Sequence, residues 1–314
     1  MTVLTPRTAY ALQTSAPLFS KEFADRFLSY LDVAPASVST YAKAINAFLR
    51  FLSAEGISAP RREDIIRYKE TLVAEGKKPT TIQTYLIAVR LFFRFLKQEG
   101  YAEDIAEHIK APRLTKGHKK DYLTSAQCKD VLAAFDRSTP QGRRDYAAVL
   151  LMTVCGLRTI EVVRADVGDL RTLGDSTVLY VLGKGRSEKT DFLRIPPVVE
   201  KAIRESLKDR KGVGADAPLF SSLSRNNLGG RMTTRAVSGI AKEAFRAVGI
   251  DSERITAHSL RHTAVTLALL AGVPLEEVQA FARHSNIATT QIYAHNLDLM
   301  KNKSESAICG ALFS

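Results

Sequence analysis

The sequence predicts a mainly α-helical chain of two domains, in which a helical bundle precedes a mostly helical α+β domain with a small antiparallel sheet. The chain has 314 residues, which suggests two domains of ordinary size. Its first third holds an internal repeat whose apolar residues follow helical spacing. A basic stretch with Pro and Gly separates this repeat from a region with a single strand–turn–strand pattern.

An internal repeat with an offset of 44 residues organises the first domain. Thr40-Tyr41 recurs as Thr84-Tyr85, and most of the segment 48–52 recurs in 92–96. Apolar residues in both copies recur three and four positions apart, as on one face of a helix. Two copies are too few for a solenoid, so the repeat favours a compact bundle. The four expected helices span 18–32, 37–55, 62–75 and 79–99.

Candidate capping residues predict where the two repeat helices begin and end. A Gly suited to the position after a helix closes each copy, at Gly56 and Gly100. Hydroxyl side chains that can accept from free N–H groups lie near each start. These candidates are Ser37 and Ser39 in the first copy, and Thr80 and Thr81 in the second.

The second domain is expected to start a helix near Thr124 and to continue mostly as helix. TVLYVL at 177–182 predicts a strand, Gly183-Lys184-Gly185 a turn, and 192–195 the return strand. The remaining helices are expected at 142–155, 159–164, 196–210, 233–248, 258–272 and 274–283, with Pro274 in the first turn of the last and a short helix or turn at Tyr293. The expected division is 1–17 (extension), 18–109 (first domain), 110–122 (linker), 123–298 (second domain) and 299–314 (tail).

The charge balance points to a polyanionic partner, because the net charge is +12. Three cysteines without metal-ligand spacing fit reduced thiols. No secretion signal and no apolar run long enough to span a membrane are evident. We therefore expect a cytoplasmic protein that does not span a membrane.

An ordered set of residues carries the chemical argument: Arg158, Lys184, His258, Arg261, His284 and Tyr293. In isolation each has an ordinary structural explanation, such as an ion pair for Arg158 or an idle surface lysine for Lys184. Together they supply a nucleophile, cations for a phosphate and an acid for a leaving oxygen. Glu161 lies one turn after Arg158 and is expected to orient it.

A zinc site is the main alternative for the histidines, because His262 follows His258 by four residues. The zinc-protease pattern requires Glu directly after the first His, and this chain has Ser259 there. His262 is therefore expected to be a packing or supporting residue.

The order and spacing of the six residues resemble the tyrosine recombinases, or phage-type integrases. The resemblance covers most of the chain: 18–100 resemble the helical, SAM-like core-binding domain, and 121–297 the catalytic domain. It implies that Tyr293 attacks the scissile phosphate to form a 3′-phosphotyrosyl link. Arg158, Arg261 and His284 would then stabilise the phosphate, Lys184 would protonate the 5′ oxygen, and His258 would act as base or proton shuttle.

Two features depart from the family pattern. The usual Leu-Gly-His-Ser before the nucleophile reads Ala282-Arg283-His284-Ser285 here. The segment from Lys184 to Pro196 is longer than in Xer-type relatives, which leaves Lys189 as an alternative catalytic lysine. These departures favour a mobile-element integrase over a resolvase of chromosome dimers.

The resemblance also implies a bacterial, nucleoid-associated enzyme that needs no metal or cofactor, and it implies the partners. Four protomers would act on two DNA duplexes with inverted-repeat core sites, through a Holliday junction, with accessory DNA-bending proteins as a further possibility. The tail would dock on a neighbouring protomer. Candidate DNA-binding residues on the repeat helices are Ser39, Lys43, Thr81, Gln83 and Arg90.

Two other functions fit parts of the pattern. A type IB topoisomerase shares the constellation, but would relax DNA without site preference. A non-catalytic DNA-binding accessory protein would share the fold, but would not need all six residues.

Overall fold

The computed structural model describes residues 17–113, 121–183, 188–210, 212–301 and 304–313. The chain divides into two compact units, Met1–Lys116 and Gly117–Ser314. No described helix is both long and apolar enough to cross a membrane.

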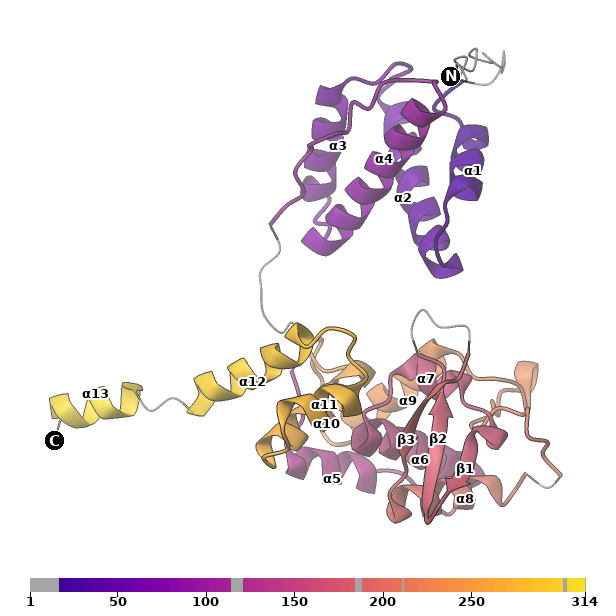
Figure 1. Ribbon diagram of the computed structural model, residues 1–314, viewed down its shortest axis with the longest axis vertical. Helices are drawn as coiled ribbons and strands as arrows, with labels where there is room; N and C mark the ends of the chain where they lie inside the picture. Colours follow the sequence, from indigo (N-terminus) through magenta and orange to yellow (C-terminus); the bar gives the residue numbers. More distant parts are fainter. Residues whose placement is uncertain (1–16, 114–120, 184–187, 211, 302–303, 314) are drawn as a thin grey trace, which may run out of the picture. The chain divides into compact units, whose positions relative to one another are not determined.

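The first unit is a bundle of four helices (Figure 1). They are α1 (Lys21–Tyr30), α2 (Pro35–Ala54), α3 (Arg62–Ala74) and α4 (Pro79–Gln98). The two repeat helices, α2 and α4, lie against each other, with α1 against both and α3 against α4. All four helices confirm the sequence prediction to within a few residues.

Proline, and not a hydroxyl side chain, starts each repeat helix. Pro35 and Pro79 occupy the first turn, where a missing N–H costs nothing. The expected hydroxyl caps at Ser37, Ser39, Thr80 and Thr81 are wrong, because both helices begin before them. The C-terminal expectation is confirmed: Gly56 and Gly100 adopt the left-handed conformation that ends a helix, at φ 66° and 75°.

Aromatic rings fill the core of the first unit. Phe48 on α2 and its repeat counterpart Phe92 on α4 are both fully buried. The ring of Phe48 lies 5.1 Å from Tyr68 and 6.1 Å from Phe93, centroid to centroid, both near edge-to-face. The repeat therefore places equivalent apolar residues of α2 and α4 in one core.

The second unit is mostly helical, as predicted. Its helices are α5 (Ser125–Ala133), α6 (Pro140–Cys155), α7 (Thr159–Arg164), α8 (Pro197–Leu207), α9 (Thr234–Ala247), α10 (Ala257–Leu270), α11 (Leu275–Ala282), α12 (Ala288–Lys301) and α13 (Ser304–Phe313), with two 3₁₀ turns, η1 (Val167–Asp169) and η2 (Arg225–Asn227). Thr124 caps α5 as expected, through the N–H of Gln127. Pro274 lies one position before α11, at its N-cap and not inside its first turn.

The sheet has three antiparallel strands in the order β1-β2-β3. They are β1 (Leu170–Leu173), β2 (Ser176–Val181) and β3 (Asp191–Arg194). The expected strand and return strand are β2 and β3; β1 went unpredicted because it is short and largely exposed. Its Arg171 lies over the ring of Tyr180 on β2, 4.7 Å from the centroid, which helps to hold this edge strand.

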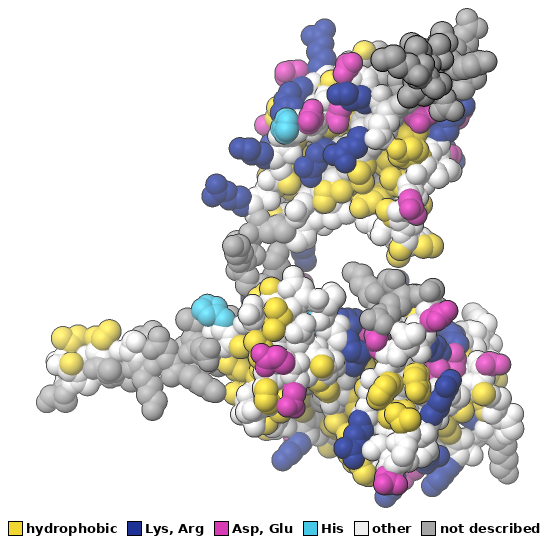
Figure 2. Space-filling view, in the orientation of Figure 1, with side chains coloured by type: hydrophobic (Ala, Val, Ile, Leu, Met, Phe, Trp, Pro, Cys, Tyr) yellow, Lys and Arg dark blue, Asp and Glu magenta, His cyan; other side chains and the backbone are white. Residues whose placement is uncertain are grey.

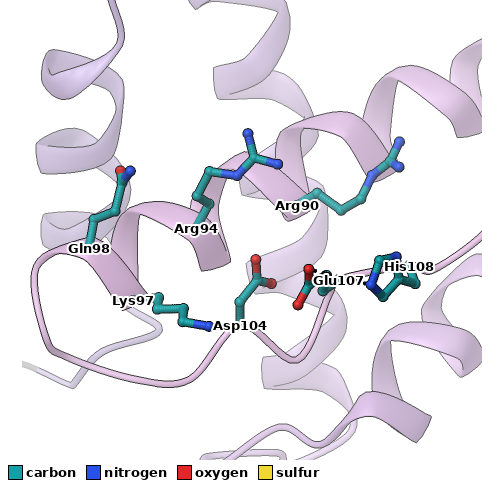
Figure 3. A pocket seen from close by; sticks show the side chains of 7 residues that line it. All are labelled: Arg90, Arg94, Lys97, Gln98, Asp104, Glu107 and His108. Carbon is teal, nitrogen blue, oxygen red and sulfur yellow. Dashed lines mark ion pairs between the residues drawn. The ribbon is translucent and has the colours of Figure 1, made fainter.

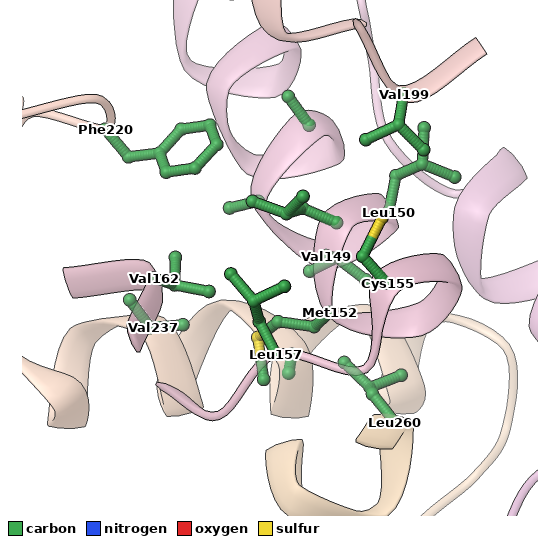
Figure 4. Close-up of a cluster of buried hydrophobic side chains, with 14 of the residues drawn as sticks. Val149, Leu150, Met152, Cys155, Leu157, Val162, Val199, Phe220, Val237 and Leu260 are labelled. Carbon is green, nitrogen blue, oxygen red and sulfur yellow. The ribbon is translucent and has the colours of Figure 1, made fainter. Parts of the chain in front are cut away.

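Helix α6 forms the centre of the second unit and contacts α5, α7, α8, α9 and α10. Figure 4 shows how residues of α6, including Val149 and Met152, meet Leu157, Phe220 and Leu260. Because α6 is buried over most of its surface, its C-terminal end and the turn into α7 have a fixed position. This turn carries the first candidate catalytic residue.

We expect Phe48→Ala to destabilise the chain by about 3–5 kcal/mol, because truncation of a buried phenylalanine leaves a cavity. Urea unfolding of the full chain, followed by far-ultraviolet circular dichroism, measures the change. Val73→Ala, at a 55% exposed position on α3, is the control and should shift stability by less than about 0.5 kcal/mol. Equal shifts in the two variants would contradict this description of the core.

Candidate active site

The turn between α6 and α7 delivers Arg158 to the site. Gly156 ends α6 in the left-handed conformation, at φ 61°. A Cβ atom there would lie 3.1 Å from the ring of Phe281, so both conformation and space favour glycine. Arg158 follows in extended conformation at the N-cap of α7. The Gly-Leu-Arg segment thus directs a guanidinium away from the buried end of α6.

Glu161 orients Arg158, as the one-turn spacing predicts. The backbone N–H of Arg158 donates to Oε2 of Glu161 at 2.9 Å, and its Nη1 donates to Oε1 at 2.7 Å. Glu161 is fully buried. Burial works against its charged form, but Arg283 and Arg158 outweigh burial and hold the pKa of Glu161 below its usual value.

Arg261 on α10 is the most buried cation of the site, at 2% exposure. Its Nη1 donates to the carbonyl of Gly156, and its Nη2 to the carbonyl of Ala282 at the end of α11. Burial, followed by the charges of Arg158 and Arg283, lowers the pKa of Arg261 to about 9. A buried guanidinium surrounded by like charges attracts an anion.

Tyr293 on α12 lies in a small apolar cluster with Val265, Val278 and Ala282, and is 6% exposed. Its hydroxyl is hydrogen bonded to Nδ1 of His262, on the neighbouring α10. Burial raises the pKa of Tyr293 to about 12, although Arg261 and Arg158 pull it down. The phenol is therefore protonated at neutral pH and held by a group that can accept its proton.

Two histidine rings, His262 and His284, lie beside the ring of Tyr293, and a third, His258, packs against His262. His262 lies 5.3 Å from the ring of Tyr293, and His258 lies 4.6 Å from His262, centroid to centroid. His284 stacks on Tyr293 at 6.3 Å, and its Nδ1 is 2.9 Å from the hydroxyl oxygen of Thr290. Burial and the guanidinium groups lower the pKa of His284 to about 4, so its ring is neutral at neutral pH.

Of the two candidate lysines, Lys184 and Lys189, the structure describes only Lys189. Lys184 lies outside the described residues. Lys189 precedes β3 and forms ion pairs with Asp166, at 2.6 Å, and with Asp169. Burial opposes its charge, but hydrogen bonds to these carboxylates raise the pKa of Lys189 above its usual value. Lys189 is thus an anchored cation beside the sheet.

Sequence reasoning underestimated two residues of this site. His262 was expected to pack or support, yet it contacts the Tyr293 hydroxyl. The available signal was its spacing, because His258 and His262 share one face of α10. Arg283 was noted only as a lost glycine, yet its Nη2 donates to Oε2 of Glu161 at 2.9 Å. No periodicity predicts that contact, because it joins α7 to the end of α11.

The zinc alternative gains no support. Within the described ranges, no group of three His, Cys, Asp or Glu side chains is arranged to hold a metal ion. Instead, His262 contacts Tyr293 of the site described above, and His258 packs against His262.

The candidate DNA-binding residues lie on α2 and α4 of the first unit. Ser39 and Lys43 are exposed on α2, whereas Thr81, Gln83 and Arg90 are half-buried on α4. Lys43 lines one hollow, together with Lys21, Arg50 and Tyr85, and Arg90 lines another. Lys and Arg side chains gather on the face of this unit seen in Figure 2.

The hollow beside Arg90 carries both signs of charge. It is lined by Arg90, Arg94 and Lys97 of α4 and by Asp104 and Glu107 of the following segment, and Lys97 points toward Asp104 (Figure 3). Acidic side chains repel a phosphate backbone, so this cleft is less suited to DNA than the hollow beside Lys43. DNA contact by these residues stays a prediction.

Comparison with known proteins supplies family context for this geometry. The Phage integrase family matches residues 121–300, and the Phage integrase, N-terminal SAM-like domain matches residues 24–100. Tyrosine recombinase XerC of Caldanaerobacter subterraneus subsp. tengcongensis is 33% identical over 192 residues, which cover 60% of this chain and 51% of that protein. The chain therefore spans about half the length of this relative.

A longer match and two solved structures extend the comparison. Tyrosine recombinase XerD of Caulobacter vibrioides is 31% identical over 286 residues, which cover 87% of this chain and 91% of the relative. XerH site-specific recombinase bound to palindromic difH substrate has TM-score 0.71 at 18% identity, covering 86% of this chain and 79% of that one. A lambda integrase tetramer bound to a Holliday junction has TM-score 0.67 at 19% identity, covering 87% and 76%. These structures share the fold.

We expect Glu161→Gln to destabilise the chain by about 3–5 kcal/mol at neutral pH, because it leaves two partly buried guanidiniums without a counter-charge. A depressed carboxyl pKa adds stability above the unfolded value, about 4.3, that is lost as pH falls through the folded value. The difference from wild type should therefore shrink in acid. Thermal unfolding across pH measures it.

Glu277→Gln is the control for this experiment, because Glu277 is exposed on α11. It should change the melting temperature little at any pH. A Glu161→Gln protein as stable as this control at neutral pH would contradict the role given to the buried carboxylate.

Proposed function

Since this chain belongs to the phage integrase family, we propose that it is a site-specific tyrosine recombinase. It would cleave and rejoin DNA strands through a covalent 3′-phosphotyrosyl intermediate. The observation that carries the proposal is the bonded Tyr293–His262 pair, buried beside Arg261 and Arg158. The residues that we propose as nucleophile, proton acceptor and phosphate-binding cations thus come together in one unit from distant parts of the sequence.

The nucleophilic step needs a base, because burial keeps the pKa of Tyr293 near 12. The phenol oxygen would bond to phosphorus while its proton passes to Nδ1 of His262. The rings of His258 and His262 meet at nearly a right angle, so this second ring can support the proton transfer. We therefore extend the base role expected of His258 to the pair of histidines.

The phosphate would be stabilised by Arg158 and Arg261, the electrostatic contribution that is usually largest in such reactions. His284 would assist as a neutral hydrogen-bond donor. When its Nδ1 accepts from the hydroxyl of Thr290, the ring proton is on Nε2 and can be donated to a phosphate oxygen. The low pKa of His284 favours this neutral form.

The bond between phosphorus and the 5′ oxygen breaks as that oxygen gains a proton. We assign this proton to Lys184. Lys189 is a poor acid, because Asp166 and Asp169 bind its ammonium group and raise its pKa. The phosphotyrosyl bond then conserves the energy needed to reseal the strand, when a 5′ hydroxyl attacks it and Tyr293 leaves.

Assembly on DNA is the broader part of the proposal. Residues 18–109 would bind the inverted-repeat core sites, through Ser39, Lys43, Thr81, Gln83 and Arg90, and four protomers would join two duplexes through a Holliday junction. The lambda integrase tetramer on such a junction supports this by its shared fold. Apolar side chains of α13 are exposed and suited to docking on a neighbouring protomer, notably Leu312 and Phe313. Integration of a mobile element and accessory DNA-bending proteins would fit this scheme.

Tyr293→Phe should abolish covalent attachment to DNA while preserving DNA binding, because it removes only the hydroxyl. Labelled, nicked inverted-repeat duplexes are incubated with protein, denatured in SDS and examined for adducts. Tyr180→Phe, on β2, is the control and should still form the adduct. An adduct in Tyr293→Phe, or none in wild type despite DNA binding, would contradict the proposal. Adducts on every sequence alike would indicate a topoisomerase.

His262→Asn should slow cleavage by at least about 100-fold at neutral pH, because asparagine cannot accept the tyrosine proton. The deficit should narrow as pH rises and the phenol ionises unaided. His258→Asn should cause the smaller loss. Single-turnover cleavage rates across pH test this, and the opposite ranking would make His258 the direct base.

A further inference from the structure

Arg283 occupies a position where the backbone favours glycine. It ends α11 in the left-handed conformation, at φ 52° and ψ 47°. Among the described residues only His108 is a second non-glycine with positive φ. Such a conformation costs a residue with a Cβ free energy and persists where surrounding contacts hold it. The contacts of the Arg283 side chain must therefore offset the cost of this backbone conformation, and we ask what else they do.

The side chain of Arg283 reaches across the site to α7 and the end of α6. Its Nη2 donates to Oε2 of Glu161 at 2.9 Å and to the carbonyl of Gly156 at 3.3 Å. Its Nη1 donates to the carbonyl of Phe281 at 2.9 Å. The side chain is 10% exposed, and its buried Nε has no acceptor within the part of the chain that the structure describes.

The two carboxylate oxygens of Glu161 thus accept hydrogen bonds from two different guanidiniums. Arg158 binds Oε1 with Nη1, and Arg283 binds Oε2. The second terminal nitrogen of Arg158 makes only a long contact, 3.4 Å, with the carbonyl of Arg283. Arg158 is also the most exposed of the three arginines of the site, at 24% of its side chain. The Nη2 edge of Arg158 is therefore held in position by Glu161 but makes only this long hydrogen bond among the described residues.

The charge balance also leaves net positive charge at the site. Arg158, Arg261 and Arg283 bring three positive charges against the single carboxylate of Glu161. If Arg283 were absent, Glu161 would compensate Arg158 alone, and less positive potential would remain for a phosphate.

We propose that Arg283 is a positioning residue. It shares Glu161 with Arg158, orients the Nη2 edge of Arg158 toward the scissile phosphate and adds to the positive potential there. This inference rests on the proposed function. It makes the loss of the family glycine a feature of the site and not a defect of the turn.

Arg283→Gly tests the inference, because glycine tolerates the left-handed backbone while the whole side chain, with its guanidinium, is removed. We expect the cleavage rate at saturating DNA to fall about 10-fold, with DNA affinity within about two-fold of wild type. Arg283→Lys should recover part of the rate, because it restores a charge without the fork. His108→Gly replaces the other described non-glycine residue with positive φ, in the first unit, and should leave the rate unchanged.

A second measurement needs no DNA cleavage. Inorganic phosphate should raise the melting temperature of wild type more than that of Arg283→Gly, with Arg283→Lys between them. A turn residue without an electrostatic role would change the melting temperature itself but not its response to phosphate. Equal cleavage rates, or equal phosphate responses, in wild type and Arg283→Gly would overturn the inference. Failure of wild type to form an adduct would instead overturn the proposed function, and the phosphate responses would still decide the role of Arg283.

Discussion

The buried carboxylate of Glu161 is the constraint on which the site depends. It lies on the short helix α7 and receives hydrogen bonds from Arg158 of the same turn and from Arg283 at the end of α11. A charge without solvent must be fully paired, so the carboxylate fixes both guanidiniums and the distance between the two segments. The positions of Arg158 and of the chain leading to Tyr293 are thereby linked through one side chain.

Backbone carbonyls at helix C-termini complete this arrangement. Arg261 donates to the carbonyls of Gly156, which ends α6, and Ala282, which ends α11. Helix C-termini carry partial negative charge and free carbonyls, so two of them can accept a buried guanidinium without a second carboxylate. The left-handed turns at Gly156 and Arg283 aim these groups inward. The site remains cationic because most of its partners are dipoles and not anions.

The sequence predicted most elements of the fold, because helix periodicity and the repeat are local signals. It missed β1, whose stability depends on pairing with β2 and on Arg171 over Tyr180. In the candidate site, spacing predicted the pairing of Arg158 with Glu161, which lies within one turn. It could not predict that Arg283 binds the same carboxylate, or that His262 rather than His258 meets the phenol, because tertiary packing decides both.

The electrostatics of Tyr293 explain how the nucleophile can stay inert without substrate. Burial raises its pKa to about 12, while Arg261 and Arg158 act in the opposite direction. A phosphate bound to these arginines would partly cancel their effect on the phenol, so their help must come chiefly through the charge that develops on phosphorus. The proton then needs an acceptor already in contact, which is where His262 lies. Positive charge and base are therefore separate requirements, met on α10 by the adjacent residues Arg261 and His262.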